Sequence, residues 1–304
     1  MGRHAVTMTR IGVVGAGTMG VCVSYAFALG GHEVVLVDNE PEALPAAMAR
    51  IRHEARFAGL VSRARGGPEM DEVLARIDAT TYLAALGDVG YVLENISENW
   101  QAKQALYRQL DQICPEDCVL AVNTSAIPIT KLAAETTRAD KVIGNHFMNP
   151  AHLMPLVEVV RAAHTSDLTL ATSRALIAGI GKDSVVVADS SGFVTNRVLM
   201  LTINEAIFVL SEGISTAVDV DRLFRQCFGH RMGPLETADL IGLDTVLYSL
   251  EVLQTEFGDP KYRPCPMLRR QVEAGWLGRK TGRGFHHYDE LRDGDTRPDG
   301  EGRA

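Results

Sequence analysis

Two ionisable side chains, a histidine and a glutamate, have the types and the setting of a general acid–base pair. His146 follows a predicted strand over Val142–Gly144, and Glu158 comes 12 residues later, inside the apolar run Leu156–Val160. A carboxylate in the middle of such a strand is costly to bury unless it is paired. A histidine on the neighbouring strand would gain a fixed tautomer and a stabilised charged form from this pairing. A lone histidine is more often structural, but the embedded glutamate favours a catalytic pair.

Further polar side chains stand at the predicted ends of successive strands or just after the last of them. These residues are Glu98, Asn123, Thr124, Ser125 and Asn196. Ligands of open α/β sheets bind at the carboxyl ends of the strands, so we expect these groups near the same site as His146. Ser and Asn also favour turns and helix caps, so their types alone leave a structural interpretation equally open.

A glycine-rich turn near the N-terminus predicts a dinucleotide site. The apolar run Ile11–Val14 leads into G-x-G-x-x-G, a helical pattern follows, and Asp38 ends the second predicted strand. The first glycine permits the tight turn, the second admits the pyrophosphate, and the third lets helix and strand pack closely. Asp38 would bind the ribose hydroxyls and repel a 2′-phosphate, which favours NAD over NADP. The predicted cofactor-binding residues of the turn are Gly15, Gly17, Thr18, Met19 and Gly20.

Strands that alternate with helices predict a mostly parallel sheet covered on both faces. The predicted strands are Ile11–Val14, Val34–Val37, Ile77–Tyr82, Tyr91–Glu94, Val119–Val122, Val142–Gly144, Leu156–Val160 and Val185–Val187. After Ser190 the pattern is helical, with helices expected at Val194–Leu210, Asp219–Phe228, Glu236–Phe257 and Pro266–Ala274. We therefore expect an α/β fold: an N-terminal Rossmann-type, doubly wound domain over 1–189, then an all-α C-terminal domain over 190–288. Residues 289–304 have few apolar side chains and are expected to form a disordered tail.

The composition excludes several classes of function. The chain has 304 residues, with 30 Lys and Arg against 38 Asp and Glu, a formal net charge of −8. This balance argues against a nucleic-acid partner, and no apolar run is long enough to predict a membrane span. The five cysteines are odd in number and lack the spacing of a zinc site, so we expect no metal, reduced thiols and a cytoplasmic location.

The sequence resembles the L-3-hydroxyacyl-CoA dehydrogenase family from about residue 9 to residue 288. The matching segments, in order along the chain, are IGVVGAGTMG, NTSAIPIT, KVIGNHFMNP, LVEVV, DSSGFVTNR, RMGPLETADLIGLD and GWLGRKTGRGF. The resemblance implies an NAD-dependent oxidoreductase that interconverts a 3-hydroxyacyl thioester and its 3-oxoacyl form. The expected substrate is a short-chain acyl-CoA such as 3-hydroxybutyryl-CoA, and the helical domain is expected to form a homodimer.

The resemblance also assigns roles to particular residues. It implies His146 as the catalytic base and Glu158 as its orienting partner, with Ser125 and Asn196 in contact with the substrate. Asn149 is a further expected substrate contact. The positions that would line the nicotinamide side of the cleft are Glu98, Lys103 and Asn123. From residue type alone, Lys103 would instead be a solvated charge on a helix face.

Three departures from the family pattern keep other substrates open. Ala151–Pro155 replaces the usual segment after the catalytic histidine, arginines replace lysines between Ala49 and Pro68, and Trp100 stands where smaller residues are usual. The alternatives are a hydroxyacyl group on an acyl carrier protein, as in the synthesis of polyketide extender units, and a free sugar acid such as L-gulonate.

The related 3-hydroxyisobutyrate and 6-phosphogluconate dehydrogenases need a lysine that Gly192–Asn196 lacks. A non-enzymatic NAD-binding protein would be expected to lose catalytic groups.

Overall fold

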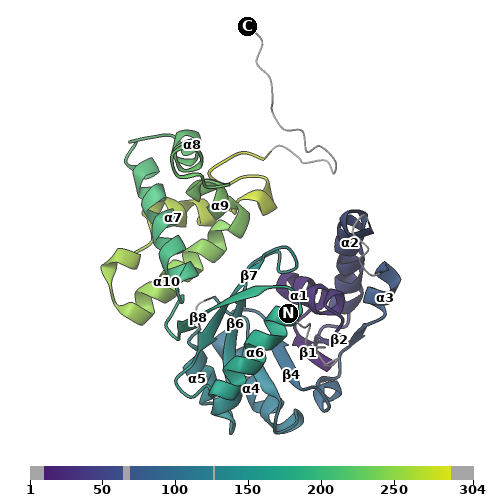
Figure 1. The fold of residues 1–304 in the computed structure, drawn as a ribbon. Helices are drawn as coiled ribbons and strands as arrows, with labels where there is room; N and C mark the ends of the chain where they lie inside the picture. Colours follow the sequence, from purple (N-terminus) through teal and green to yellow (C-terminus); the bar gives the residue numbers. More distant parts are fainter. Residues whose placement is uncertain (1–9, 64–68, 126, 289–304) are drawn as a thin grey trace. The chain divides into compact units, whose positions relative to one another are not determined.

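The computed structural model describes residues 10–63, 69–125 and 127–288, with no side-chain description for 57–63. The chain divides into two compact units, the first ending at Phe193 and the second beginning at Val194 (Figure 1). The sequence-based boundary after residue 189 lies just before this division. The predicted tail over 289–304 lies outside the described residues.

The first unit is built on an eight-stranded sheet with the order β3-β2-β1-β4-β5-β6-β7-β8 (Figure 1). The strands are β1 (Arg10–Val14), β2 (Glu33–Val37), β3 (Ile77–Thr80), β4 (Tyr91–Glu94), β5 (Val119–Val122), β6 (Val142–Phe147), β7 (Leu156–Arg161) and β8 (Asp183–Ala188). The first six strands of the sheet, β3, β2, β1, β4, β5 and β6, run parallel to one another. Strand β7 is antiparallel to β6 and parallel to β8. This strand order is that of a doubly wound Rossmann-type sheet, extended at one edge by two reversed strands.

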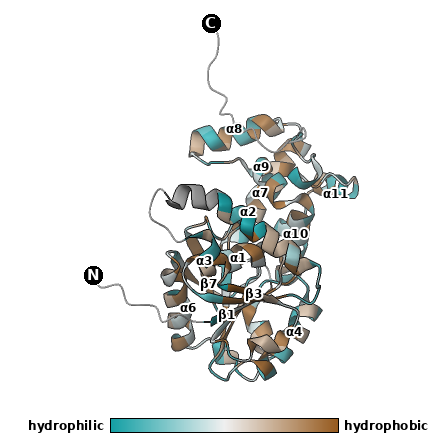
Figure 2. Ribbon diagram, turned by 90° about the vertical axis from the view of Figure 1, so that its right-hand side faces the viewer, coloured by the Kyte–Doolittle hydropathy of each residue, from teal (hydrophilic) through white to brown (hydrophobic). Residues whose placement is uncertain are grey.

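Helices cover both faces of this sheet. One hydrophobic core joins the sheet to α1 (Thr18–Leu29), α2 (Ala43–Arg63), α3 (Met70–Leu74) and α6 (Asp167–Gly179), and a second core joins it to α4 (Trp100–Ile113) and α5 (Ile129–Ala133). Successive residues of a strand enter opposite cores, for example Val13 and Val14. The central strands β1, β2, β4 and β5 are covered on both faces and are therefore mostly buried and apolar, and much of the sheet is brown in Figure 2, whereas β3 and β8 at the two edges are partly exposed.

The second unit is helical in the part of it that the structure describes, apart from isolated bridges involving Gly278, Arg283 and His287. Its helices are α7 (Thr195–Ser211), α8 (Ala217–Phe228), α9 (Pro234–Ile241), α10 (Leu243–Phe257) and α11 (Pro266–Glu273). The single helix predicted over Glu236–Phe257 is wrong, because it is two helices. Gly242 separates them at φ +102°, a conformation outside the helical region that side chains rarely adopt.

Two buried carboxylates fix the end of the described chain to this unit. Asp239 accepts hydrogen bonds from the amides of Phe285 and His286, both at 2.9 Å. Asp221 accepts from His286 Nε2 at 2.7 Å. A Cβ atom on Gly284 would lie 1.9 Å from Asp239 Oδ1, so the close approach of the segment requires glycine at that position.

The His286–Asp221 contact predicts a pH dependence of stability. The hydrogen bond to Asp221 raises the pKa of His286, burial opposes it, and Asp239 and Glu236 add to the rise. A raised folded-state pKa stabilises the protein fully below about pH 6.5, and the stabilisation disappears as the pH rises through the folded value. We expect His286→Gln to lower the thermal midpoint most in acid and least in alkali. Unfolding scans of both proteins across this range measure the difference, and a difference independent of pH would contradict the assignment.

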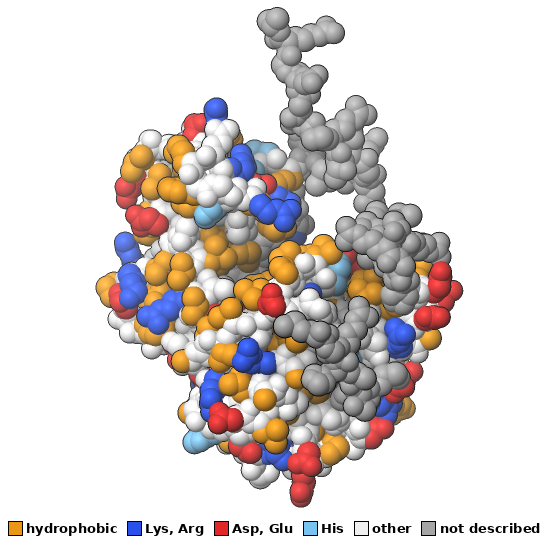
Figure 3. Space-filling model, in the orientation of Figure 1, with side chains coloured by type: hydrophobic (Ala, Val, Ile, Leu, Met, Phe, Trp, Pro, Cys, Tyr) orange, Lys and Arg blue, Asp and Glu red, His pale blue; other side chains and the backbone are white. Residues whose placement is uncertain are grey.

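Charge and hydropathy over the rest of the molecule add two observations. On the face shown in Figure 3, the Lys and Arg side chains are interspersed with Asp and Glu and do not gather into one basic area. Among the described residues, the structure contains no helix with the length and apolar character needed to cross a bilayer.

Candidate active site

Strand pairing brings His146 and Glu158 together. The antiparallel register of β6 and β7 sets His146 directly opposite Glu158, so their side chains share one face of the sheet. His146 Nδ1 lies 3.0 Å from Glu158 Oε2. Both residues are buried, at 6% and 5% exposure. A carboxylate at Nδ1 favours the tautomer that carries its proton there and leaves Nε2 as an acceptor. His146 lies within β6, whereas the sequence placed it after that strand.

Ser125 occupies the other side of the imidazole. It follows β5, and its Oγ lies 3.1 Å from His146 Nε2. The Phe193 ring packs edge-on against the imidazole, with ring centres 5.7 Å apart. Glu158, His146 and Ser125 therefore form a continuous chain of polar contacts. This arrangement can take a proton from a hydroxyl group near Ser125, either that of the serine or that of a bound molecule.

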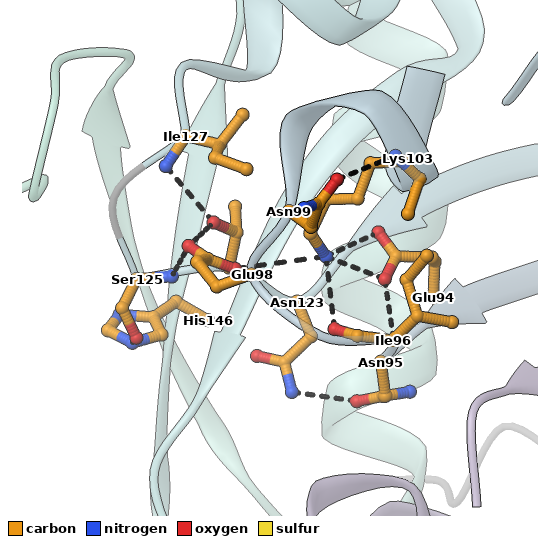
Figure 4. Close-up of polar contacts among 12 residues, drawn as sticks. Glu94, Asn95, Ile96, Glu98, Asn99, Lys103, Asn123, Ser125, Ile127 and His146 are labelled. Atoms are coloured by element: carbon orange, nitrogen blue, oxygen red, sulfur yellow. Dashed lines mark hydrogen bonds and ion pairs between the residues drawn. The ribbon is translucent and has the colours of Figure 1, made fainter. Parts of the chain in front are cut away.

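Glu98 lies beside Ser125, as the sequence led us to expect (Figure 4). Its Oε1 accepts hydrogen bonds from the Thr124 hydroxyl and, at 3.2 Å, from the amide of Ser125. Its Oε2 faces Lys103 Nζ at 3.9 Å. The carboxylate thus joins the loop after β4 to the loop after β5.

Lys103 has no exposed surface, so the interpretation as a solvated helix-face charge is wrong. Its Nζ lies 2.6 Å and 2.8 Å from the two carboxylate oxygens of Glu94, which is equally buried. Burial raises the pKa of the Glu94 carboxyl, and the Lys103 ammonium opposes that rise. Sequence reasoning missed Glu94. Its signal is a carboxylate that ends an apolar strand, whereas Glu158 was identified as a carboxylate in the middle of one.

The asparagine positions differ in their surroundings. Asn123 donates through Nδ2 to Asn95 Oδ1 at 2.7 Å and accepts from the amide of Phe147 at 3.1 Å, so it ties together the ends of three strands. Asn149 is exposed, and its Oδ1 lies 3.9 Å from Cys22 Sγ. Asn196 belongs to the second unit, at the start of α7. A substrate or cofactor role for these three residues stays a prediction.

Two of the positions that depart from the family pattern, Ala151–Pro155 and Trp100, pack into the first unit. The His152 ring lies edge-on to Tyr25 with its Nε2 3.4 Å from Glu54, and burial lowers the pKa of His152. Lys182 Nζ donates to the carbonyl of Met154 at 2.8 Å. Trp100 packs against the second core beneath Lys131, whose Nζ is 4.1 Å from the ring centre. These contacts favour a packing role for Trp100.

The glycine turn has the shape of an anion cradle at the N-terminus of α1. Gly15 has φ +98°, and a Cβ on Gly20 would lie 1.7 Å from the carbonyl oxygen of Gly15. A Cβ on Gly17 would meet nothing within 4 Å, so the space in front of the helix is open. The turn therefore fits a pyrophosphate, as the sequence predicts. Thr18 begins α1, and Arg50 donates to its hydroxyl at 3.3 Å.

A cavity of about 410 Å³ continues from this turn along the ends of β1 and β2. Asp38 lines this cavity and accepts hydrogen bonds from the amides of Ala16, at 2.6 Å, and Glu40, at 2.9 Å. The other lining residues are Val14, Gly15, Val37, Asn39, Thr81, Leu83, Ile96, Ala102, Ala105, Leu106 and Gln109. Apolar walls with one carboxylate fit the adenosine half of NAD. Sequence reasoning missed the wall formed by α4, although the amphipathic pattern of that helix was visible.

Two family models cover nearly all of the described chain. Residues 10–190 match the model of the 3-hydroxyacyl-CoA dehydrogenase NAD binding domain, and residues 192–288 match that of the 3-hydroxyacyl-CoA dehydrogenase C-terminal domain.

Individual relatives agree with these matches. The chain is 45% identical to a probable 3-hydroxybutyryl-CoA dehydrogenase of Bacillus subtilis, over 92% of this chain and 98% of the relative. It is 42% identical to a 3-hydroxybutyryl-CoA dehydrogenase of Bradyrhizobium diazoefficiens, over 93% and 97%. The crystal structure of (S)-3-hydroxybutyryl-CoA dehydrogenase from Ralstonia eutropha superposes with a TM-score of 0.86 at 43% identity, covering 93% of this chain and 100% of that one.

Proposed function

The chain belongs to the 3-hydroxyacyl-CoA dehydrogenase family, and from this premise we propose that it interconverts 3-hydroxybutyryl-CoA, or a similarly short 3-hydroxyacyl-CoA, and the 3-oxoacyl-CoA. It is an NAD-dependent oxidoreductase acting on a CH–OH group. The observation that carries the assignment of the reaction to particular residues is the contact chain Ser125–His146–Glu158.

The proton of the substrate's 3-hydroxyl is taken by His146 Nε2. Glu158 holds the Nδ1 proton and stabilises the positive imidazolium that results, in a setting where burial strengthens the interaction. Ser125 Oγ, 3.1 Å from Nε2, orients the reacting oxygen toward that nitrogen. In the reverse direction the imidazolium returns the proton. When bound, NAD supplies the acceptor for the hydride that leaves C3.

The residues that would hold NAD lie along the carboxyl ends of β1, β2, β4 and β5. Gly15, Gly17, Thr18, Met19 and Gly20 form the cradle for its pyrophosphate, and Asp38 binds the adenosine ribose. We assign Glu98 and Asn123 to the nicotinamide side, where Glu98 adjoins Ser125. Lys103 belongs to the same group of residues through its contact with Glu98.

The charged end of the acyl-CoA requires cations on the same unit. Arg50, Arg52 and Arg56 are exposed on α2, and guanidinium groups bind phosphate in two-point contacts. We assign these arginines to the CoA phosphates. Asn149 and Asn196 are proposed to make polar contacts with the acyl part of the substrate.

The proposed substrate is tested by steady-state assays with NAD and the 3-hydroxybutyryl group on CoA, on an acyl carrier protein or as the free acid, and by the same assay with L-gulonate. We expect the highest kcat/KM with the CoA thioester. We expect the double variant Arg52→Gln/Arg56→Gln to raise KM for the CoA thioester and to leave KM for NAD unchanged. Arg50 is kept in this variant because it contacts Thr18 of the proposed pyrophosphate cradle. A preference for the carrier-linked substrate, or activity with L-gulonate alone, would overturn the choice of CoA.

We also propose a homodimer built on the helical unit. Large apolar side chains on α7 and α8, among them Val198, Val218, Leu223 and Phe228, are more than half exposed. Such surfaces mark protein contacts. Sedimentation equilibrium should give twice the chain mass, and a monomer would contradict the proposal.

The five cysteines are free thiols, which supports a reducing compartment such as the cytoplasm.

A further inference from the structure

The connection between the neighbouring strands β6 and β7, residues 148–155, begins directly after the strand that carries His146 (Figure 1). Within it the amides of Leu153 and Met154 both donate to the carbonyl of Pro150, at 3.0 Å and 3.1 Å. These are the bonds of a single helical turn, which is too short to be stable by itself. The position of the turn therefore depends on its contacts with the rest of the first unit.

A buried lysine directly before β8 supplies two of these contacts. Lys182 is 7% exposed, and its Nζ donates to the carbonyl of Met154 at 2.8 Å and to that of His152 at 3.4 Å. The amide of the next residue, Asp183, donates to the carbonyl of Pro155 at 2.8 Å. The start of β8 thus binds the second half of the connection through one ammonium and one amide.

The ammonium of Lys182 has no anionic partner to offset its burial. Within the described part of the chain, its Nζ contacts two backbone carbonyls and no carboxylate. Burial lowers the pKa of Lys182, as expected when a positive charge is taken out of water. Apolar side chains of similar size often replace buried ionic groups without loss of stability. Stability alone therefore does not account for a lysine here, and we attribute its role to the turn that it binds.

The other side of the connection is fixed to α1 and α2. The His152 ring lies edge-on to Tyr25, with ring centres 5.3 Å apart, and its Nε2 is 3.4 Å from Glu54 Oε2. Asn149 Oδ1 lies 3.9 Å from Cys22 Sγ on α1. Asn149 therefore stands directly before a turn that is held from both sides.

We propose that Lys182 is a positioning residue of the dehydrogenase: its ammonium fixes the turn 150–154 and, through that turn, places Asn149 for its contact with the acyl substrate. The contacts run from Lys182 Nζ to two carbonyls of the turn, from two amides of the turn to Pro150, and along the chain to Asn149. The proposal rests on the reaction and on the Asn149 contact proposed above.

The central test is Lys182→Met, which keeps the length of the side chain and removes its charge and its donors. Two carbonyls lose a donor while a buried charge disappears, so we expect the variant to fold. We expect kcat/KM for 3-hydroxybutyryl-CoA to fall by about 10- to 10²-fold, the order of loss that follows when a contacting group moves by up to about 1 Å. In the enzyme without ligands, amide hydrogen exchange at Leu153, Met154 and Asp183 should become faster.

A double-mutant cycle with Asn149→Ala distinguishes positioning from a purely structural role. If Lys182 acts through Asn149, Lys182→Met should lower kcat/KM little further once residue 149 is alanine. Lys182→Arg retains a cation that can donate to both carbonyls, so its loss should be smaller and should disappear in the same background. This second variant takes the place of Lys182→Met in the cycle if the methionine variant does not fold.

Lys141→Met is the matched control. Lys141 directly precedes β6, as Lys182 precedes β8, and its Nζ donates to the carbonyl of Glu116 in another loop at 2.6 Å. The control variant should keep the wild-type kcat/KM and the wild-type exchange rates in the connection.

Four results would overturn the proposal. They are a folded Lys182→Met variant with wild-type kcat/KM, wild-type kcat/KM in Asn149→Ala, additive losses in the double variant, and unchanged exchange at Leu153, Met154 and Asp183. If the wild-type enzyme does not turn over 3-hydroxybutyryl-CoA, the substrate assignment fails instead. The exchange measurement needs no substrate, so it still tests whether Lys182 fixes the turn.

Discussion

His146→Gln should reduce turnover of 3-hydroxybutyryl-CoA by at least about 10²- to 10⁴-fold, the usual contribution of a general base. The amide of glutamine is comparable in size to the imidazole and can contact both Ser125 and Glu158, but it cannot take up a proton near neutral pH. Because the proposed cofactor cavity lies at β1, β2 and α4, NADH affinity should be retained. Steady-state kinetics measure the loss, and fluorescence titration with NADH measures the retained site.

The matched control is His164→Gln, which changes an exposed histidine of the same unit. We expect it to leave both turnover and NADH binding at the wild-type level. Near wild-type turnover in His146→Gln would eliminate His146 as the base. A parallel loss of NADH binding would instead indicate a damaged fold.

Glu158→Gln should produce the second-largest loss, up to about 10⁴-fold in kcat, by analogy with amide replacement of the aspartate in a serine-protease triad. The carboxamide fills the same space, but its NH₂ group can donate to Nδ1 and so favour the tautomer that protonates Nε2. The substitution also removes the negative charge of Glu158, which stabilises the imidazolium of His146. The measurement is kcat together with KM, and we expect the loss to fall on kcat because the effect arises only as the proton moves.

The control for loss of a partly buried carboxylate is Asp189→Asn. Asp189 accepts hydrogen bonds from the amides of Ile129 and Thr130, at 3.0 Å and 2.7 Å, and touches none of the proposed catalytic groups. It should lower the unfolding midpoint and leave kcat unchanged. If His146→Gln and Glu158→Gln are combined, the losses should not add, because the two residues act as one unit. Additive losses would show that Glu158 has a separate role.

The sequence was sufficient to predict the pairing of His146 with Glu158 for a physical reason. A carboxylate embedded in an apolar strand has few ways to be satisfied, and a histidine next to the preceding strand is one of them. The shape of the glycine turn could be predicted for a similar reason, because the close backbone approach at Gly15 and Gly20 requires glycine, whereas the binding of ribose by Asp38 stays a prediction. At such positions the local backbone geometry or the burial of a charge restricts the residue type, so the residue can be interpreted from sequence.

Features set by distances between elements could not be predicted in this way. Lys103 has a sequence context typical of an exposed helix, and only the packing of α4 against β4 buries it on Glu94. The break at Gly242 was missed because an apolar pattern continues across it, and a single glycine can stand within a helix or end one. Likewise, His146 lies within β6 because pairing with β7 extends that strand to Phe147, a tertiary effect.

The antiparallel register of β6 and β7 bears on how such an enzyme can diversify. The pairing of His146 with Glu158 is fixed by backbone hydrogen bonds between strands, whereas residues 148–155 connect the two strands outside the ladder. Changes in the connection leave the register intact, but inserting one residue into β7 ahead of Glu158 would turn its side chain to the opposite face. A lineage can therefore remodel the segment that follows the proposed catalytic histidine, here Ala151–Pro155, while the pairing of His146 with Glu158 is inherited unaltered.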